Sequence, residues 1–150
     1  MTELADFTAL IRRDHGLCVV STLRADTTIQ SSVVNVGVLD HPVTGSPVVA
    51  FTTRRGGAKL VNLRARPRAT AVVRSGWEWA AAEGPAELAG PDDPYPGIDA
   101  EALRVLLRDV FTAAGGTHDD WPAYDAVMAQ EARAVVMIAP QRVYSNALGA

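Results

Sequence analysis

Residues 49–70 read VAFTTRRGGAKLVNLRARPRAT, and this stretch decides the expected fold. It begins inside an apolar, β-branched run at 48–53, which predicts a strand that ends in two threonines. Two glycines follow, and apolar residues at near-helical spacing then predict a short helix that Pro67 ends. The next strand is expected at 68–75. The stretch is therefore a strand, a glycine loop, a short helix and a second strand in succession.

The segments on either side add further strands and helices. Apolar residues at helical spacing predict a helix over 3–14, and strands are expected at 17–24 and 28–39. Prolines and a glycine mark a turn at 41–47. After the stretch, the sequence predicts a strand at 77–88, an irregular acidic loop at 89–97, helices at about 98–114 and 120–131, and last strands at 134–138 and 143–144.

This order of elements indicates the fold class. Five or six mainly sequential strands with short helices at the ends are typical of an antiparallel barrel with helical decoration, which is α+β by class. A strict alternation of strands and helices is absent, which argues against a doubly wound nucleotide-binding fold. The 150 residues are 48% hydrophobic and contain no internal repeat or long linker. We therefore expect one domain, over 1–150, with a substantial core.

Cysteine usage and hydropathy bear on the compartment. The single cysteine, Cys18, lies in an apolar run. We expect it to be a small core residue in a reducing compartment, with a reactive thiol as the alternative. No run approaches the roughly 18 apolar residues that span a bilayer, and the first residues lack the pattern of a secretion signal. The sequence therefore predicts a cytoplasmic protein with no membrane partner.

Charge is distributed unevenly along the chain. No acidic residue occurs between Asp40 and Glu78, whereas from Glu78 to Asp125 eleven carboxylates accompany only two arginines. Clustered cations in a chain of net charge -3 favour a local anionic ligand such as a phosphate. The overall pI near 5.5 argues against nucleic acid, and a solvated helix face is the alternative for several of these arginines. The seven cations between Asp40 and Glu78 are Arg54, Arg55, Lys59, Arg64, Arg66, Arg68 and Arg74.

The loop within this cationic segment contains the groups expected of a phosphate site. Thr52 and Thr53 end a strand, and glycines lead into a helix start that carries Lys59, the only lysine of the chain. Hydroxyls, exposed amides and a cation at a helix start are typical of phosphate binding. The spacing fits neither the dinucleotide nor the P-loop pattern, and a single lysine is also compatible with chance.

Other catalytic motifs are absent from the sequence. None of the three histidines has a second His or Cys at metal-ligand spacing, so we expect no metal site. His118-Asp119-Asp120 is expected to cap the following helix. No Gly-x-Ser-x-Gly elbow occurs, and we assign no catalytic side chain.

Several segments in order resemble a known family. Residues 49–70 look like the cofactor segment of the pyridoxamine 5'-phosphate oxidase-like FMN-binding split barrels, in which a Lys follows a Thr- or Ser-ended strand and an Asn-Leu…Pro-Arg stretch leads into the next strand. The segment GWEWAAAEGPAEL at 76–88 is similar to a hairpin of the branch that uses coenzyme F420. HDDWPAY at 118–124 and PQRVY at 140–144 also fit that branch. The resemblance spans nearly the whole chain.

The resemblance implies a split antiparallel β-barrel that forms a homodimer, with flavin-type cofactors in clefts between the subunits. Lys59 would contact the ring or phosphate of the cofactor, and Thr52 and Thr53 its phosphate and ribityl region. Relatives often carry a basic residue where this chain has Gly57. Arg55, or its neighbour Arg54, is the expected substitute.

The same resemblance assigns the ring region. The strand around Val34, Asn35 and Val36 would lie along the ring, partly through backbone groups. Trp77 and Trp79, on one face of a strand by their period of two, would wall the pocket from the partner subunit. Ordinary dimer core is the alternative for this pair.

The implied function is that of an F420-dependent reductase, which transfers a hydride between coenzyme F420 and a small conjugated organic substrate. The cofactor carries the hydride in such enzymes, which is consistent with the absence of a recognisable triad. FMN is the alternative cofactor, and a non-catalytic F420 carrier is the alternative from another functional class. The identity of the substrate does not follow from the sequence.

Overall fold

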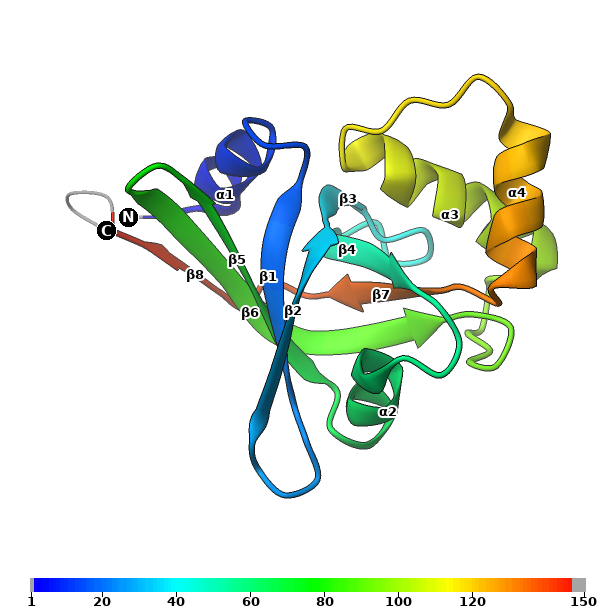
Figure 1. Cartoon of the computed structure of the whole chain (residues 1–150), viewed down its shortest axis with the longest axis horizontal. Coiled ribbons are helices and arrows are strands. Elements are labelled where there is room, and N and C mark those ends of the chain that lie inside the picture. Colours follow the sequence, from blue (N-terminus) through cyan, green and yellow to red (C-terminus); the bar gives the residue numbers. More distant parts are fainter. Residues whose placement is uncertain (1, 147–150) are drawn as a thin grey trace.

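A computed structural model of the chain describes residues 2–146. Within them, four helices and eight strands follow one another along the chain (Figure 1). Their order is α1 (Leu4–Ile11), β1 (Leu17–Leu23), β2 (Ile29–Asn35), β3 (Gly37–Asp40), β4 (Pro47–Thr53), α2 (Ala58–Ala65), β5 (Arg68–Ser75), β6 (Glu78–Ala89), α3 (Ala100–Ala113), α4 (Trp121–Gln130), β7 (Ala134–Ile138) and β8 (Arg142–Ser145).

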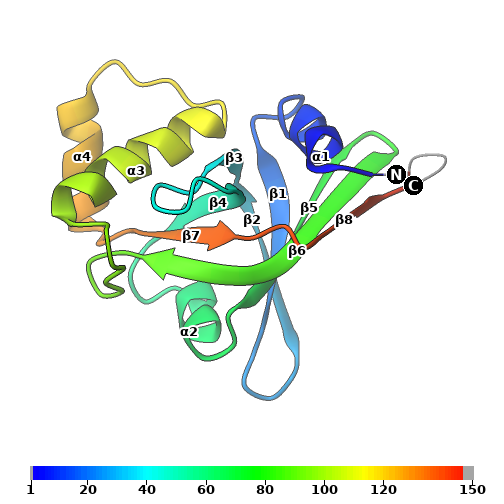
Figure 2. The same ribbon diagram turned by 180° about the vertical axis from the view of Figure 1, so that it is seen from behind.

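The strands form one antiparallel, strongly curved sheet. Its order is β2-β1-β5-β6-β7-β4-β3, and β8 pairs with β6 off this path. The twelve-residue β6 bends so that Glu78–Pro85 pairs with β5, whereas Ala86–Ala89 pairs with β7 (Figure 2). One strand therefore belongs to both halves of the barrel. This architecture confirms the predicted α+β class with an antiparallel barrel.

The barrel differs from the prediction where a single strand was expected over 28–39. The structure divides this segment into β2 and β3, which occupy opposite edges of the sheet. The break falls at Val36, which is fully buried and donates its backbone N–H to the carbonyl of Gly16. This tertiary contact turns the chain from one edge to the other and divides the expected strand in two. The described residues contain eight strands in all, more than the five or six of the expected barrel.

Two other local expectations are confirmed, and one is wrong. Asp120 is the N-cap of α4, and its carboxylate accepts a hydrogen bond from the N–H of Ala123. Cys18 is 2% exposed, and burial raises the pKa of its thiol to about 12, as expected of a core residue. Trp77 was expected within a strand, but it lies in the turn before β6 and is 93% exposed.

Two apolar clusters lie on the two faces of the sheet. The first fills the barrel and includes Phe7 of α1 and Phe51 of β4. The second packs α3 and α4 onto the opposite face of β3, β4 and β7 (Figure 1). Neighbouring residues of β4 alternate between the clusters, Val49 facing the first and Val48 the second, as the pleat of a strand requires. No helix among residues 2–146 is long and apolar enough to cross a membrane.

The bend of β6 depends on a glycine that has no room for a side chain. A Cβ at Gly84 would lie 1.9 Å from the carbonyl oxygen of Ala139, where the chain leaves β7 and crosses this strand. We expect Gly84→Ala to lower the free energy of unfolding by about 1–3 kcal/mol, the usual cost of overpacking against backbone that cannot move freely. Urea denaturation of the purified chain measures the loss.

Gly45→Asn is the control for this substitution. Gly45 has a φ of +76° and no neighbouring atom within 4 Å, and asparagine adopts this conformation more readily than most residues. Its loss should be the smaller of the two. Equal losses would contradict the steric explanation for Gly84.

Candidate functional site

A cavity of about 510 Å³ lies between the end of β2, the end of β4 and the pair α3–α4. Val33, Val34 and Asn35 line it from β2, and Thr52 lines it from β4. The helices contribute mainly apolar and aromatic side chains, including Phe111 and Tyr124. Its volume is in the range of natural small-molecule sites.

The β2 wall of the cavity is an edge strand. β2 pairs only with β1, so among the described residues its other edge has no neighbouring strand. Backbone groups on such an edge are available to a ligand. The Asn35 side chain donates to the carbonyl of His15 at 2.8 Å, which fixes it at the rim. Of the three predicted ring contacts, Val34 and Asn35 line the cavity, whereas Val36 is in the core.

The β4 wall ends in the two predicted threonines. Thr53 is 5% exposed. The Thr52 hydroxyl lies at the cavity, 3.2 Å from Nη1 of Arg133. Arg133 also lines the cavity and forms an ion pair with Glu131, at 2.8 Å. Sequence reasoning missed Arg133, which lies 81 residues from Thr52 along the chain.

Lys59 lies beside this cavity, at the start of α2. Its Nζ donates to the hydroxyl of Ser32 at 2.9 Å, one residue before the cavity-lining Val33. No carboxylate among residues 2–146 forms an ion pair with it. Partial burial, and then the positive charge of Arg133, lower the pKa of the Lys59 ammonium group. A half-buried ammonium without a counter-ion is suited to an anionic ligand.

The other cations of this segment behave differently. Arg55 binds Asp92 through two hydrogen bonds, of 2.6 and 2.9 Å, and Arg64 binds Asp93 in the same bidentate manner. Hydrogen bonding to Arg55 lowers the pKa of the Asp92 carboxyl. The acidic loop therefore folds onto the cationic segment and neutralises two of its arginines. Arg55 does not line the cavity, although it was predicted to bind the cofactor.

Comparison with solved structures identifies the architecture. No family model matches the chain. An F420 reductase superposes with a TM-score of 0.60 at 17% identity, over 92% of this chain and 95% of its own. A pyridoxamine 5'-phosphate oxidase-related, FMN-binding protein from Nostoc punctiforme PCC 73102 gives 0.65 at 12% identity, over 95% and 80%. A heme-binding protein from Mycobacterium smegmatis gives 0.64 at 18% identity, over 100% and 57%.

The fold is the FMN-binding split barrel. The predicted split barrel with peripheral helices is thereby confirmed. The names of these three proteins refer to three different ligands, F420, FMN and heme. At such low identities the comparisons establish only the fold of this chain.

The two tryptophans lie at another end of the split barrel. Trp79 is half-buried in β6, and its ring meets that of Tyr144 edge-on at 6.1 Å. The carbonyl of Trp77 accepts a hydrogen bond from the side chain of Asn146. Neither residue lines the cavity beside β2 within its own chain. Their predicted role, which requires a second subunit, stays a prediction.

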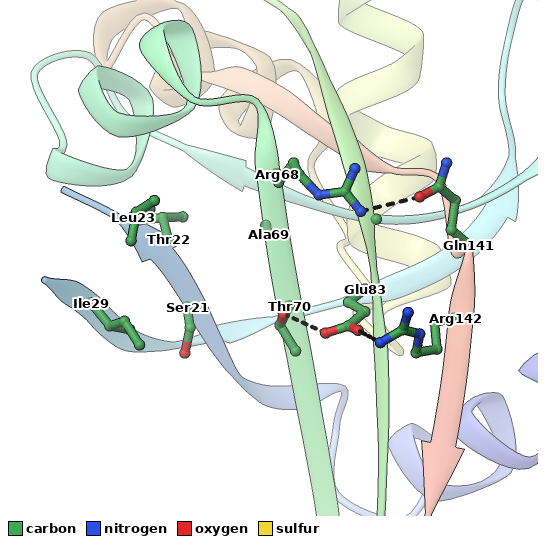
Figure 3. A pocket seen from close by; sticks show the side chains of 11 residues that line it. Ser21, Thr22, Leu23, Ile29, Arg68, Ala69, Thr70, Glu83, Gln141 and Arg142 are labelled. Atoms are coloured by element: carbon green, nitrogen blue, oxygen red, sulfur yellow. Dashed lines mark hydrogen bonds and ion pairs between the residues drawn. The ribbon is translucent and has the colours of Figure 1, made fainter. Parts of the chain in front are cut away.

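A second, shallower cavity of about 610 Å³ lies on the outer face of the split barrel (Figure 3). Each of its charged side chains has a partner within the lining, although the partner of Arg68 is a neutral amide. Glu83 accepts from the Thr70 hydroxyl at 3.2 Å and pairs with Arg142 at 3.4 Å. Arg68 donates to the side-chain oxygen of Gln141 at 3.1 Å. This internal pairing makes the outer cavity a weaker candidate for an anion than the site beside Lys59.

Aromatic packing and one carboxylate hold the helical wall of the β2 cavity. Tyr124 packs its ring 5.1 Å from Phe111 and donates its hydroxyl to the carbonyl of Leu107. Asp125 joins α4 to α3 by accepting hydrogen bonds from Arg104 and Arg108. No group of three or more His, Cys, Asp or Glu side chains in the described part of the chain is arranged to hold a metal ion.

The Asp125 contact makes a prediction about pH. Hydrogen bonds from Arg108, and secondarily from Arg104, lower the pKa of the Asp125 carboxyl in the folded protein. A carboxyl whose pKa is lower when folded stabilises the protein above its unfolded pKa, about 3.9, and loses this contribution as the pH falls through the folded pKa. We therefore expect Asp125→Asn to be less stable than the original chain at pH 7. The difference should shrink at acidic pH, as urea denaturation at several pH values will show.

Asp109→Asn is the matched control, because Asp109 is exposed on α3 and its carboxylate forms no hydrogen bond or ion pair with another described side chain. Its stability should follow that of the original chain at every pH. If the difference in free energy of unfolding between Asp125→Asn and the original chain stays constant down to low pH, an ionic contribution is contradicted.

Proposed function

We propose that this split barrel is an oxidoreductase that binds coenzyme F420 and transfers a hydride between it and a small conjugated organic substrate, with FMN as the alternative cofactor. The observation that carries the proposal is the β2 cavity. Among the described residues, the strand edge that faces this space of ring size is unpaired, and the ammonium group beside it has no counter-ion. A planar heterocycle with an anionic tail matches both features.

The residues present fit such a cofactor in two respects. A ring with carbonyl and N–H groups finds backbone partners along the β2 edge near Val34 and Asn35. A phosphate on its tail finds the Lys59 ammonium and the Thr52 hydroxyl. The cavity lining contains no carboxylate that would repel an anion.

The chain itself would position the reactants and exclude water. When bound, the reduced cofactor supplies a hydride, which together with a proton from solvent reduces a double bond of the substrate. Phe111 and Tyr124 form an apolar wall that restricts access of water to the ring. A site that only orients two reactants requires no side-chain nucleophile, and we assign none.

Titration with three ligands separates the candidate cofactors. Fluorescence titration with F420, with FMN and with heme tests which of these the purified chain binds. A panel of conjugated acceptors then tests turnover, followed as oxidation of the reduced cofactor. Binding of F420 with no oxidation by any acceptor favours the carrier over the reductase.

We further propose that the chain forms a homodimer through the outer face of β1 and β2. Two cross-strand pairs on this face are apolar, Val19 with Val33 and Leu23 with Ile29, and the hydrogen-bonded hydroxyls of Ser21 and Ser31 lie between them. The four apolar side chains are between 38% and 66% exposed. Four exposed apolar side chains gathered on one sheet face support a protein partner there.

A charge in the middle of this face should separate the subunits. We expect Val19→Glu to be monomeric in sedimentation velocity under conditions where the original chain is dimeric, because the carboxylate would have to lose its water at the interface. Val105→Glu is the matched control, since Val105 on α3 has the same exposed fraction of 42%. A monomeric original chain would overturn the proposed dimer.

Lys59 provides the test of cofactor binding. We expect Lys59→Ala to weaken F420 binding at least about tenfold, which corresponds to about 1.4 kcal/mol for one lost charge-assisted contact. Fluorescence titration at constant salt measures the dissociation constant. Arg12→Ala removes the same charge from an exposed site without a side-chain partner among residues 2–146, and we expect a change within about twofold.

Unchanged affinity in Lys59→Ala would remove Lys59 from the site. Equal losses in both variants would show a general effect of net charge rather than a contact.

A further inference from the structure

Arg133 is held in place by an unusual turn between α4 and β7. The N–H of Arg133 bonds to the carbonyl of Met128, and that of Ala132 bonds to Ala129, which is the pattern of a Schellman cap. Ala132 occupies the left-handed position of this cap, at φ +46°, where glycine is usual. It is only 7% exposed, so the surrounding packing fixes this strained conformation. The direction in which Arg133 leaves the turn is therefore fixed as well.

The guanidinium of Arg133 is divided between two partners. Nε and Nη2 face Glu131, at 3.0 and 2.8 Å, whereas Nη1 faces the Thr52 hydroxyl at 3.2 Å. The side chain is 28% exposed and lines the β2 cavity. One edge is thus neutralised by a carboxylate, and the other edge reaches the cavity through a neutral hydroxyl.

A second cation, Lys59, lies beside the cavity next to β2, although it is not one of the lining residues. Lys59 donates to Ser32 on β2, and the charge of Arg133 is close enough to contribute to the lowered pKa of Lys59. Two like charges that converge on one half-buried site cost free energy unless an anion lies between them. Glu131 offsets only part of this charge, because it binds the far edge of Arg133.

A backbone contact ties the two cationic segments together. The N–H of Arg55 donates to the carbonyl of Glu131 at 3.1 Å, so the loop before α2 is fastened to the turn that carries Arg133. The other nearby cations are less suitable. The Arg55 side chain is occupied by Asp92, and Arg54 is exposed and lines neither of the two cavities described above.

We propose that Arg133 supplies the second positive charge of the subsite headed by Lys59, and that this pair binds the phosphate group of the cofactor tail. The inference rests on the proposed function, because it concerns the same cavity. It assigns to a residue distant in the sequence the role that the resemblance would place at position 57, where this chain has a glycine.

The test compares ligands with and without the phosphate. F420 is paired with its deazaflavin chromophore, which lacks the phosphate and tail, and FMN is paired with riboflavin. We expect Arg133→Gln to weaken F420 or FMN binding about tenfold, and to leave chromophore or riboflavin binding within about twofold. Arg133→Lys should recover part of the loss, because it restores the charge but not the planar guanidinium.

Two further variants make the result specific. Arg12→Gln controls for net charge, and Arg54→Gln tests the competing cation of the loop. Equal losses for phosphorylated and unphosphorylated ligands in Arg133→Gln would overturn the inference, as would a phosphate-specific loss in Arg54→Gln alone. If the original chain binds F420 or FMN and Arg133→Gln does not change the affinity, the inference is overturned while the proposed function stands. An original chain that binds none of the four ligands overturns both.

Discussion

Gly16, Val36 and Gly37 meet beneath the end of α3 at distances that leave no space for another side chain. A Cβ on Gly16 would lie 2.5 Å from the carbonyl oxygen of Val36, and one on Gly37 would lie 2.6 Å from the Cβ of Ala113. The close approach lets the chain leave β2, pass beneath the helix and start β3 on the opposite edge of the sheet. Within residues 2–146 the edge of β2 consequently has no neighbouring strand, and the cavity lies along that edge.

Electrostatics within the site follow from how the fold pairs the charges. Seven cations in a segment without acidic residues suggest a broad positive surface. The acidic loop neutralises two of them, Arg55 and Arg64, through ion pairs. Lys59 is not neutralised in this way, because its side chain contacts Ser32 of β2 rather than the loop. Five of the seven cations remain without an ion pair among the described residues, and Lys59 is the one whose side chain contacts β2 beside the cavity, where it suits one small anion.

Local sequence patterns predicted most elements and part of the site. Strand ends, turns and caps depend on residues that are neighbours in the sequence. The threonines at the end of β4, the short helix with Lys59 and the Asp120 cap could therefore be predicted. The division of 28–39 at Val36 could not, because β-branched residues lie on both sides of the break, which comes from contacts with distant segments.

Long-range register explains what else the sequence could not provide. Arg133 reaches Thr52 because β4 and β7 pair with Thr53 opposite Ala134, and no local signal specifies that pairing. The same limit applies to Arg55, whose partner Asp92 lies 37 residues away in an irregular loop. Composition revealed that opposite charges were present, but only the folded chain determines which of them meet.

β2 connects the proposed subunit contact with the proposed cofactor site. Val33 is 64% exposed on the apolar outer face, yet it also lines the cavity. The next residue, Val34, packs against the barrel core and lines the cavity as well, so residues from both faces of the strand reach the cavity. A partner on the outer face would cover Val33 and thereby complete one rim of the cavity. Because an edge strand has neighbours on one side only, such a contact would also hold the β2 backbone at a fixed distance from Lys59. Subunit association and cofactor affinity would then be coupled through a single strand.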